Sequence, residues 1–111
     1  MQRIYKYPIL GAEGASSRKI EFSKGAELLS AGYDLDGQLC IWAIDKGSEC
    51  ERVNRTVYCI GTGWPLDLIY PVGDKINYRF LATVKSDQYM WHIFYGPEEE
   101  IIQEETTGCL M

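Results

Sequence analysis

The stretch "AELLSAGYDLDGQLCIWAID", residues 26–45, carries the strongest indication of the fold. Two apolar runs lie on either side of the dipeptide Asp36-Gly37. Asp-Gly between such runs is typical of a two-residue type I′ hairpin turn, because both central residues of that turn need a positive φ. The stretch therefore predicts an antiparallel β-hairpin.

A two-residue turn also predicts which residues face one another across the hairpin. Leu35 is expected opposite Gln38, Tyr33 opposite Cys40, and Ala31 opposite Trp42. In the second strand, "LCIWAI", both alternating sets of side chains are apolar. This pattern favours a central strand that is covered on both faces.

Further strands are indicated on both sides of the hairpin by runs that alternate or are rich in aromatic and β-branched residues. These runs are 3–9, 18–22, 55–63, 76–84 and 88–95. Pro8 indicates that the first run ends there or lies at a sheet edge. The sequence therefore predicts an all-β, mainly antiparallel fold, a small β-sandwich or partly open barrel of about seven strands with little helix.

Charge divides the chain into a balanced body and an acidic end. Of 16 acidic residues, five lie in residues 96–111, which contain no Lys or Arg, so residues 1–95 hold 11 acids and 11 bases. We expect a single β-domain over 1–95 and an acidic C-terminal tail over 96–111. The tail could form a short helical turn over 98–106, although its two isoleucines make too small an apolar stripe for a stable helix alone.

Composition also excludes several classes of protein. A neutral body without a basic run argues against nucleic-acid binding. No apolar run approaches the roughly 20 residues that span a bilayer, so no membrane segment is expected. No two of the four cysteines have the C-x-x-C spacing of a zinc site, so no metal site is expected. They are Cys40, Cys50, Cys59 and Cys109. No cofactor motif is present, and the first residues lack the apolar region of a signal peptide, which favours a cytosolic protein with reduced thiols.

The stretch "CIGTGWPLD", residues 59–67, is the best candidate for a site. It lacks the Lys of a phosphate-binding P-loop and the third glycine of a dinucleotide fingerprint. Two glycines at a strand end, followed by Trp-Pro, instead predict a sharp turn that forms the rim of a contact surface. With the nearby aromatic strands, the candidate binding residues are Tyr58, Gly61, Thr62, Gly63, Trp64, Pro65, Trp91 and His92.

Evidence for catalysis in the sequence is weak. His92 is the only histidine, and no nucleophile motif such as G-x-S-x-G accompanies it. Cys50 lies in a polar loop with cationic neighbours, whereas Cys40 and Cys59 lie in apolar strands where inert burial is the default. We therefore assign no catalytic residue, and an enzyme that uses His92 or Cys50 remains an alternative.

The order of five short motifs resembles that of a family of short, uncharacterised proteins encoded by tailed phages and prophages. The similarity covers residues 3–95, although at position 64 the family more often has His where this chain has Trp. It implies a viral origin and a place in the cytoplasm of the bacterial host. The motifs are "IYKY" at 4–7, "KGA" at 24–26, "WA" at 42–43, "GTGWP" at 61–65 and "WHIF" at 91–94.

These observations lead to a functional hypothesis with two alternatives. The hypothesis is a non-enzymatic phage accessory protein that acts by binding, as an inhibitor of a bacterial defence system or another host protein. Exposed sheet edges and many aromatics also predict a homodimer. The alternatives are a protein that sequesters a small nucleotide-like ligand, with the base stacked on aromatics and the polar end at the amides of Gly61 and Gly63, and the small enzyme named above.

Overall fold

A computed structural model describes residues 1–9, 16–66 and 78–101, and these residues form an all-β structure. No helix occurs among them. The predicted fold class is therefore confirmed. The strands are β1 (Arg3–Pro8), β2 (Ser16–Ser23), β3 (Glu27–Tyr33), β4 (Leu39–Asp45), β5 (Arg52–Gly61), β6 (Arg79–Lys85), β7 (Met90–Tyr95) and β8 (Glu99–Glu100).

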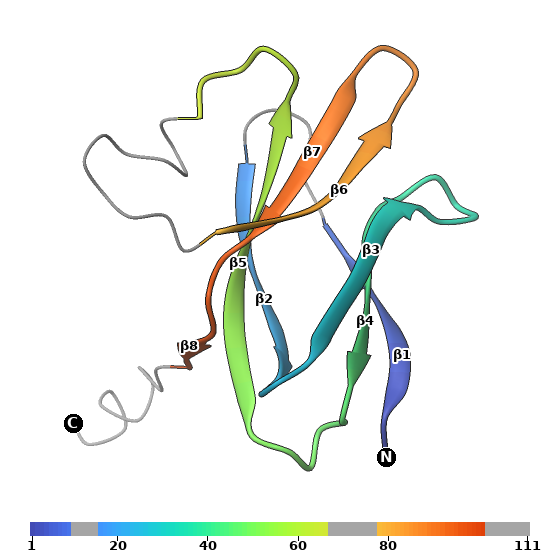
Figure 1. Ribbon diagram of the computed structural model, residues 1–111. Helices are drawn as coiled ribbons and strands as arrows, with labels where there is room; N and C mark the ends of the chain where they lie inside the picture. The colour runs from blue at the N-terminus through green and yellow to red at the C-terminus, as the bar shows by residue number, and fades with distance from the viewer. Residues whose placement is uncertain (10–15, 67–77, 102–111) are drawn as a thin grey trace, which may run out of the picture.

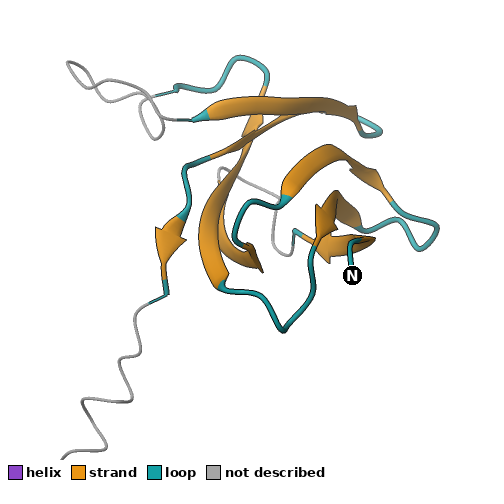
Figure 2. Ribbon diagram, turned by 60° about the horizontal axis from the view of Figure 1, so that its bottom comes forward, coloured by secondary structure: helices purple, strands orange, loops and turns teal. Residues whose placement is uncertain are grey.

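The strands form two antiparallel sheets that face one another (Figure 1). One sheet has the order β1-β4-β3, so β4 is central, as the sequence predicts. Strand β1 ends at Pro8 and also lies at an edge, so both alternatives given for Pro8 hold. The other has the order β2-β5-β7-β6, with β8 paired to the first part of β5. Strands β3 and β6 are in contact but share no hydrogen-bonded ladder, so the arrangement is sandwich-like and not a closed barrel (Figure 2).

The core fills the space between the two sheets. Alternation along each strand sends every second side chain inward, so β4 contributes Ile41 and Ala43 while β5 contributes Val57 and Cys59. All four are fully buried. Phe22 of β2 and Ile93 of β7 are equally buried and complete the same apolar cluster, which holds the two sheets together.

The β3–β4 hairpin is present, but its predicted register is wrong by one position. Tyr33 pairs with Leu39 instead of Cys40, and Ala31 pairs with Ile41 instead of Trp42. The register also shifts between Leu28 and Ser30, where β3 has one extra residue. The extra residue is a β-bulge, which bends the edge strand and increases its local twist.

The hairpin turn explains the error in register. Oδ1 of Asp34 accepts hydrogen bonds from the backbone N–H groups of Asp36 and Gln38, each 2.9 Å long. Gly37 has a φ of +79°, whereas Asp36 does not have a positive φ. The turn therefore has three residues, a type I turn followed by a left-handed glycine, because the Asp34 side chain stabilises this longer loop.

The segment after β7 also departs from the prediction. Glu99 and Glu100 form β8, opposite Asn54 and Val53 of β5, so the helical turn predicted over 98–106 is wrong as far as Ile101. Pairing gives the backbone groups of β5 partners that a helical turn would not supply. The remainder of that prediction, like Cys109, lies outside the described residues.

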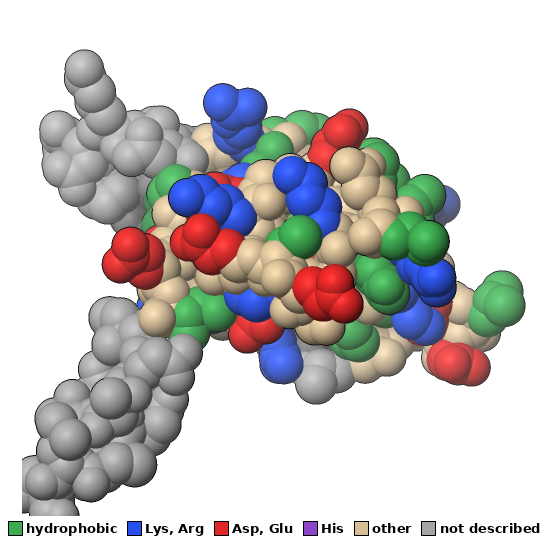
Figure 3. Space-filling view, turned by 90° about the horizontal axis from the view of Figure 1, so that it is seen from below, with side chains coloured by type: hydrophobic (Ala, Val, Ile, Leu, Met, Phe, Trp, Pro, Cys, Tyr) green, Lys and Arg blue, Asp and Glu red, His purple; other side chains and the backbone are tan. Residues whose placement is uncertain are grey.

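The surface shows no concentration of charge at the end seen in Figure 3, where Lys and Arg side chains alternate with Asp and Glu. In the part of the chain that the structure describes, no helix has the length and apolar character needed to cross a membrane.

Candidate functional site

The predicted rim forms a tight turn directly after β5. The Trp64 N–H donates to the Gly61 carbonyl over 3.0 Å, and the Thr62 N–H donates to the Met90 carbonyl over 3.2 Å. Gly63 has a φ of +87°, which only glycine adopts at little cost. A Cβ on Gly61 would lie 2.7 Å from Cε2 of Trp64. Both glycines are therefore needed, one for backbone conformation and one for the close approach of the indole ring.

Three aromatic rings meet beside this turn. Trp64 packs edge to face against Trp91, with ring centroids 5.4 Å apart at 77°, and Tyr89 stacks on Trp91 at 5.3 Å and 29°. Trp91 is only 6% exposed and belongs to the core, whereas Tyr89 is 52% exposed. The core thus anchors Trp91, and Trp91 in turn orients the two outer rings.

An open groove of about 530 Å³ lies over these rings. Tyr33 at the end of β3 and Ser86 and Asp87 of the β6–β7 turn also line it. A second hollow shares these three residues and extends the space toward Gly37 of the β3–β4 turn. We call this surface the aromatic groove; its ring residues are Tyr33, Trp64, Tyr89 and Trp91.

The structure divides the predicted site residues between two faces of the sheet. Gly61, Gly63 and Trp64 lie with Trp91 at the aromatic groove, and the exposed Pro65 follows Trp64 at its rim. His92 follows Trp91 in β7 and therefore points to the opposite face, where it contacts Thr62.

Tyr58 is also on the face opposite the groove, beside Tyr78. Their rings meet edge to face with centroids 5.0 Å apart, and their hydroxyl oxygens are 3.1 Å apart. Burial, together with this hydrogen bond, raises the pKa of Tyr58 to about 12. Tyr58 therefore stays protonated at neutral pH and serves as packing for Tyr78.

Among the described residues, the ring nitrogens of His92 contact two threonine hydroxyl groups. Nε2 lies 2.6 Å from the Thr62 hydroxyl, and Nδ1 lies 3.0 Å from the Thr83 hydroxyl. Neither contact is with a carboxylate that could stabilise an imidazolium during proton transfer. Cys50 precedes β5, whereas His92 pairs with Ile60 near the far end of that strand, so about 25 Å of extended chain separates them.

Cys40 and Cys59 are buried, as the sequence predicts. Both are fully buried, and burial raises the pKa of Cys59 to about 11. Burial, with the nearby Asp34 carboxylate, also raises the pKa of Cys40. Thiols of this kind remain protonated and are poor nucleophiles.

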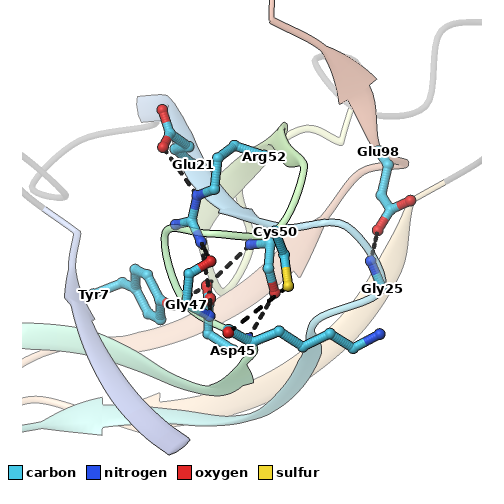
Figure 4. Close-up of polar contacts among 10 residues, drawn as sticks. Tyr7, Glu21, Gly25, Asp45, Gly47, Cys50, Arg52 and Glu98 are labelled. Carbon is cyan, nitrogen blue, oxygen red and sulfur yellow. Dashed lines mark hydrogen bonds and ion pairs between the residues drawn. The ribbon is translucent and has the colours of Figure 1, made fainter. Parts of the chain in front are cut away.

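Sequence reasoning missed one buried polar centre, which joins the two sheets (Figure 4). Asp45 is 1% exposed, and its Oδ2 accepts hydrogen bonds from the Tyr7 hydroxyl at 2.5 Å and the Ser23 N–H at 3.0 Å. Its Oδ1 accepts from the Gly47 N–H at 2.7 Å and from Nη1 of Arg52 at 2.8 Å. Tyr7 and Asp45 belong to one sheet and Ser23 and Arg52 to the other, so this centre holds the sandwich together.

The charge of Asp45 is stabilised by these four donors. Burial alone would raise the pKa of the carboxyl group, but the hydrogen bonds from Tyr7, Gly47, Ser23 and Arg52 hold it well below its usual value. The sequence contained a signal for this position. Asp45 continues the inward series Leu39, Ile41, Ala43, so an acid at this parity indicates a buried and partnered carboxylate.

No metal centre is found in the described ranges, which contain no group of three or more His, Cys, Asp or Glu side chains placed to hold an ion. The aromatic groove is the site to which most of the sequence-predicted binding residues belong. Its residues come from β3, the β5–β6 connection and the β6–β7 hairpin. The sequence did not indicate Tyr33 and Tyr89 as site residues, because only folding brings them to Trp64.

Fold and site together define an all-β, sandwich-like domain with an open aromatic groove at one end. The chain belongs to the family described as a domain of unknown function (DUF7352), whose sequence profile matches residues 1–104. No curated protein and no solved structure gives a significant match.

Proposed function

We propose that this protein is a non-enzymatic binding domain and that the aromatic groove is the surface that contacts a protein partner. The observation that carries the proposal is the fixed set of rings at the groove, where Tyr33 is 39% and Tyr89 is 52% exposed. Tyr and Trp are the residues that most often anchor protein interfaces, because they offer large contact areas at a low cost in conformational entropy.

The rigidity of the groove supports this use. Trp91 is fixed by the core, Tyr89 stacks on it, and Trp64 is held by the turn at Gly61. Binding therefore requires little ordering of these side chains, which reduces one of the main costs of association. A peptide segment that runs along the groove would contact the rings in turn, as aromatic-lined grooves of other small β-domains do.

The partner we propose is a bacterial protein, in keeping with the resemblance of the sequence to phage and prophage proteins. A small accessory protein of this kind would act by occupying a surface of a host defence protein or another host factor. The residues of the groove, and not His92 or Cys50, would carry this activity.

The experiment uses the full chain and compares three forms of it. Bacterial proteins captured by the unmodified chain are identified and purified, and their affinities for the unmodified chain, for Tyr33→Ser/Tyr89→Ser and for Phe80→Ser are measured by calorimetry. Phe80 is 55% exposed on β6 and does not line the groove, so it is the matched control. We expect the double variant to bind at least tenfold more weakly and the control to bind normally. Equal affinity of all three forms would exclude the groove as the contact surface.

Self-association is part of the proposal. Strand β1 is the edge of its sheet, and Ile4 on it is 63% exposed. Symmetric pairing of the β1 strands of two copies would satisfy the free backbone edge of each strand and bring the two Ile4 side chains into the interface. Light scattering over a range of concentrations should show a dimer, and Ile4→Lys should shift it to a monomer. A strict monomer at high concentration would contradict this part.

A further inference from the structure

Another hollow, separate from the aromatic groove and from the space beside Gly37, lies where β6 begins and β7 ends. Its volume is about 510 Å³, within the range of small-molecule sites. Two arginines line it, and both lie close to aromatic rings. We call it the arginine pocket; its main residues are Arg55, Tyr78, Arg79, Tyr95, Gly96 and Glu98.

Arg55, which lines this pocket, has one unused hydrogen-bond donor. Its Nη1 donates to the Gly96 carbonyl at 2.8 Å, its Nη2 is 3.5 Å from Glu98, and its guanidinium lies 5.4 Å from the centroid of the Tyr95 ring. Its Nε is buried and has no hydrogen-bond partner within the described residues. Leaving a buried N–H unpaired is costly, so an acceptor that reaches this atom gains free energy.

Arg79 supplies an uncompensated positive charge. It is exposed, it lies opposite Tyr95 in the β6–β7 ladder, and it forms no ion pair with any described residue. The one acid of the pocket, Glu98, is already engaged by Arg55 and by the Gly25 N–H, 2.6 Å away. The pocket therefore favours an anion although the whole chain carries a net charge of −5.

Tyr78 forms a fixed aromatic wall beside the two arginines. Its hydroxyl is hydrogen-bonded to that of Tyr58, and its ring lies so close to Gly96 that a Cβ there would be 2.6 Å from Cε1 of Tyr78. Arginine guanidinium groups recognise phosphate through paired hydrogen bonds, and aromatic rings stack on planar bases.

We propose that the arginine pocket binds a small molecule in which a phosphate group is attached near a planar ring, as in a nucleoside monophosphate. The phosphate would meet Arg79 and, after a small movement of the Arg55 side chain that uncovers it, the unpaired Nε–H of Arg55, and the base would lie against Tyr78. This ligand class matches the nucleotide alternative raised by the sequence, but its place is different. The sequence placed the polar end of such a ligand at the amides of Gly61 and Gly63, whereas the arginine pocket offers guanidinium groups. The proposal does not depend on the aromatic groove.

The test is calorimetric titration of the full chain with AMP, GMP, CMP and UMP, and with the four matching nucleosides. We expect at least one nucleotide to bind and its nucleoside to bind at least tenfold more weakly, because the phosphate contacts are charge-assisted. Arg79→Gln should weaken nucleotide binding at least tenfold. Arg79 is exposed, so this variant should fold normally. Arg18→Gln, another exposed arginine outside the pocket, is the matched control and should bind like the unmodified chain.

Nitrogen–proton correlation spectra provide a readout at the site itself. The Nε–H signal of Arg55 should shift on addition of the bound nucleotide, and inorganic phosphate alone should shift it in the same direction. The proposal is overturned if no nucleotide binds, if nucleosides bind equally well, or if Arg79→Gln binds as tightly as Arg18→Gln. An affinity that is insensitive to Tyr33→Ser/Tyr89→Ser would show that the two sites are independent.

Discussion

The hydroxyl of Tyr7 donates a 2.5 Å hydrogen bond to Oδ2 of Asp45, so the first strand of one sheet is tied to the carboxylate that also receives donors from the other sheet. Asp45 is almost completely buried, and each of its oxygens has two donors. This one side chain therefore connects β1, β2, β4 and β5.

Asp45→Asn should strongly destabilise the fold. The amide is nearly the same size, but it has no negative charge and its NH₂ group would face hydrogen-bond donors. Leaving buried donors without their charged acceptor costs about 1–3 kcal/mol or more, although Arg52 keeps its ion pair with Glu21. Urea denaturation measures the loss. Asp36→Asn, the same chemical change in an exposed turn, should alter stability by less than about 0.5 kcal/mol. Similar losses in both variants would contradict the role of Asp45.

Stability should fall in acid, and Asp34 and Asp45 should account for part of the fall. The hydrogen bond from Lys6, with those from the N–H groups of Gln38 and Asp36, lowers the pKa of Asp34 to about 2, and the pKa of Asp45 is lowered as well. Because the folded state holds these carboxyl groups ionised, their contribution is complete above the unfolded pKa of about 4 and is lost as the pH falls toward the folded values. The free energy of unfolding is measured from about pH 6 to about pH 2. Its dependence on pH should be shallower for Asp34→Asn than for the unmodified chain. An unchanged slope would show that Asp34 is not titrating in this window.

Gly61→Ala should displace Trp64 from its position against Trp91. The new methyl group would lie 2.7 Å from the indole, closer than a Cβ contact allows, so the ring must move. Near-ultraviolet circular dichroism reports the change in the tryptophan pair. Gly63→Ala should act differently, because its new methyl group would meet no atom within 4 Å. The alanine would have to adopt a left-handed φ, which should lower the free energy of unfolding by about 1–2 kcal/mol. Gly32→Ala, whose nearest neighbour is 3.6 Å from the new atom, is the control for both. Wild-type spectra for Gly61→Ala would mean that the turn does not hold Trp64 in place.

Glu98 and Glu99 should differ in their importance although they are adjacent. Glu98 accepts a hydrogen bond from the Gly25 N–H at 2.6 Å and pairs with the half-buried Arg55. Within the described ranges, the one ion pair of Glu99 is with the exposed Lys19, at 3.6 Å. Glu98→Ala should cost about 1–3 kcal/mol and Glu99→Ala less than about 0.5 kcal/mol in thermal or urea unfolding. Equal effects would indicate that the segment after β7 does not stabilise the body of the fold.

Much of the fold could be predicted from the sequence because alternation and turn residues act locally. The apolar series of β4, the interior side chains of β5 and β7, and the edge position of β1 all follow from the period of two and from Pro8. The register of the β3–β4 hairpin did not follow, since the Asp34 carboxylate binds amides further along the turn and so selects a longer loop. The prediction of a helical turn over 98–106 is wrong as far as Ile101, because this segment pairs with β5. That pairing depends on the tertiary structure and leaves no local pattern in the sequence.

By itself, the sequence determined an all-β chain, the burial of Cys40 and Cys59, and a glycine turn at the end of a strand beside tryptophan. Only the tertiary structure decided what that turn does. Side chains adjacent in a strand point to opposite faces, so Trp91 joins the aromatic groove while His92 turns away toward Thr62 and Thr83. Contacts between strands distant in sequence likewise brought Tyr33 to Tyr89 and placed Arg79 beside Arg55, because pairing order and packing between sheets, which depend on the whole chain, set those distances.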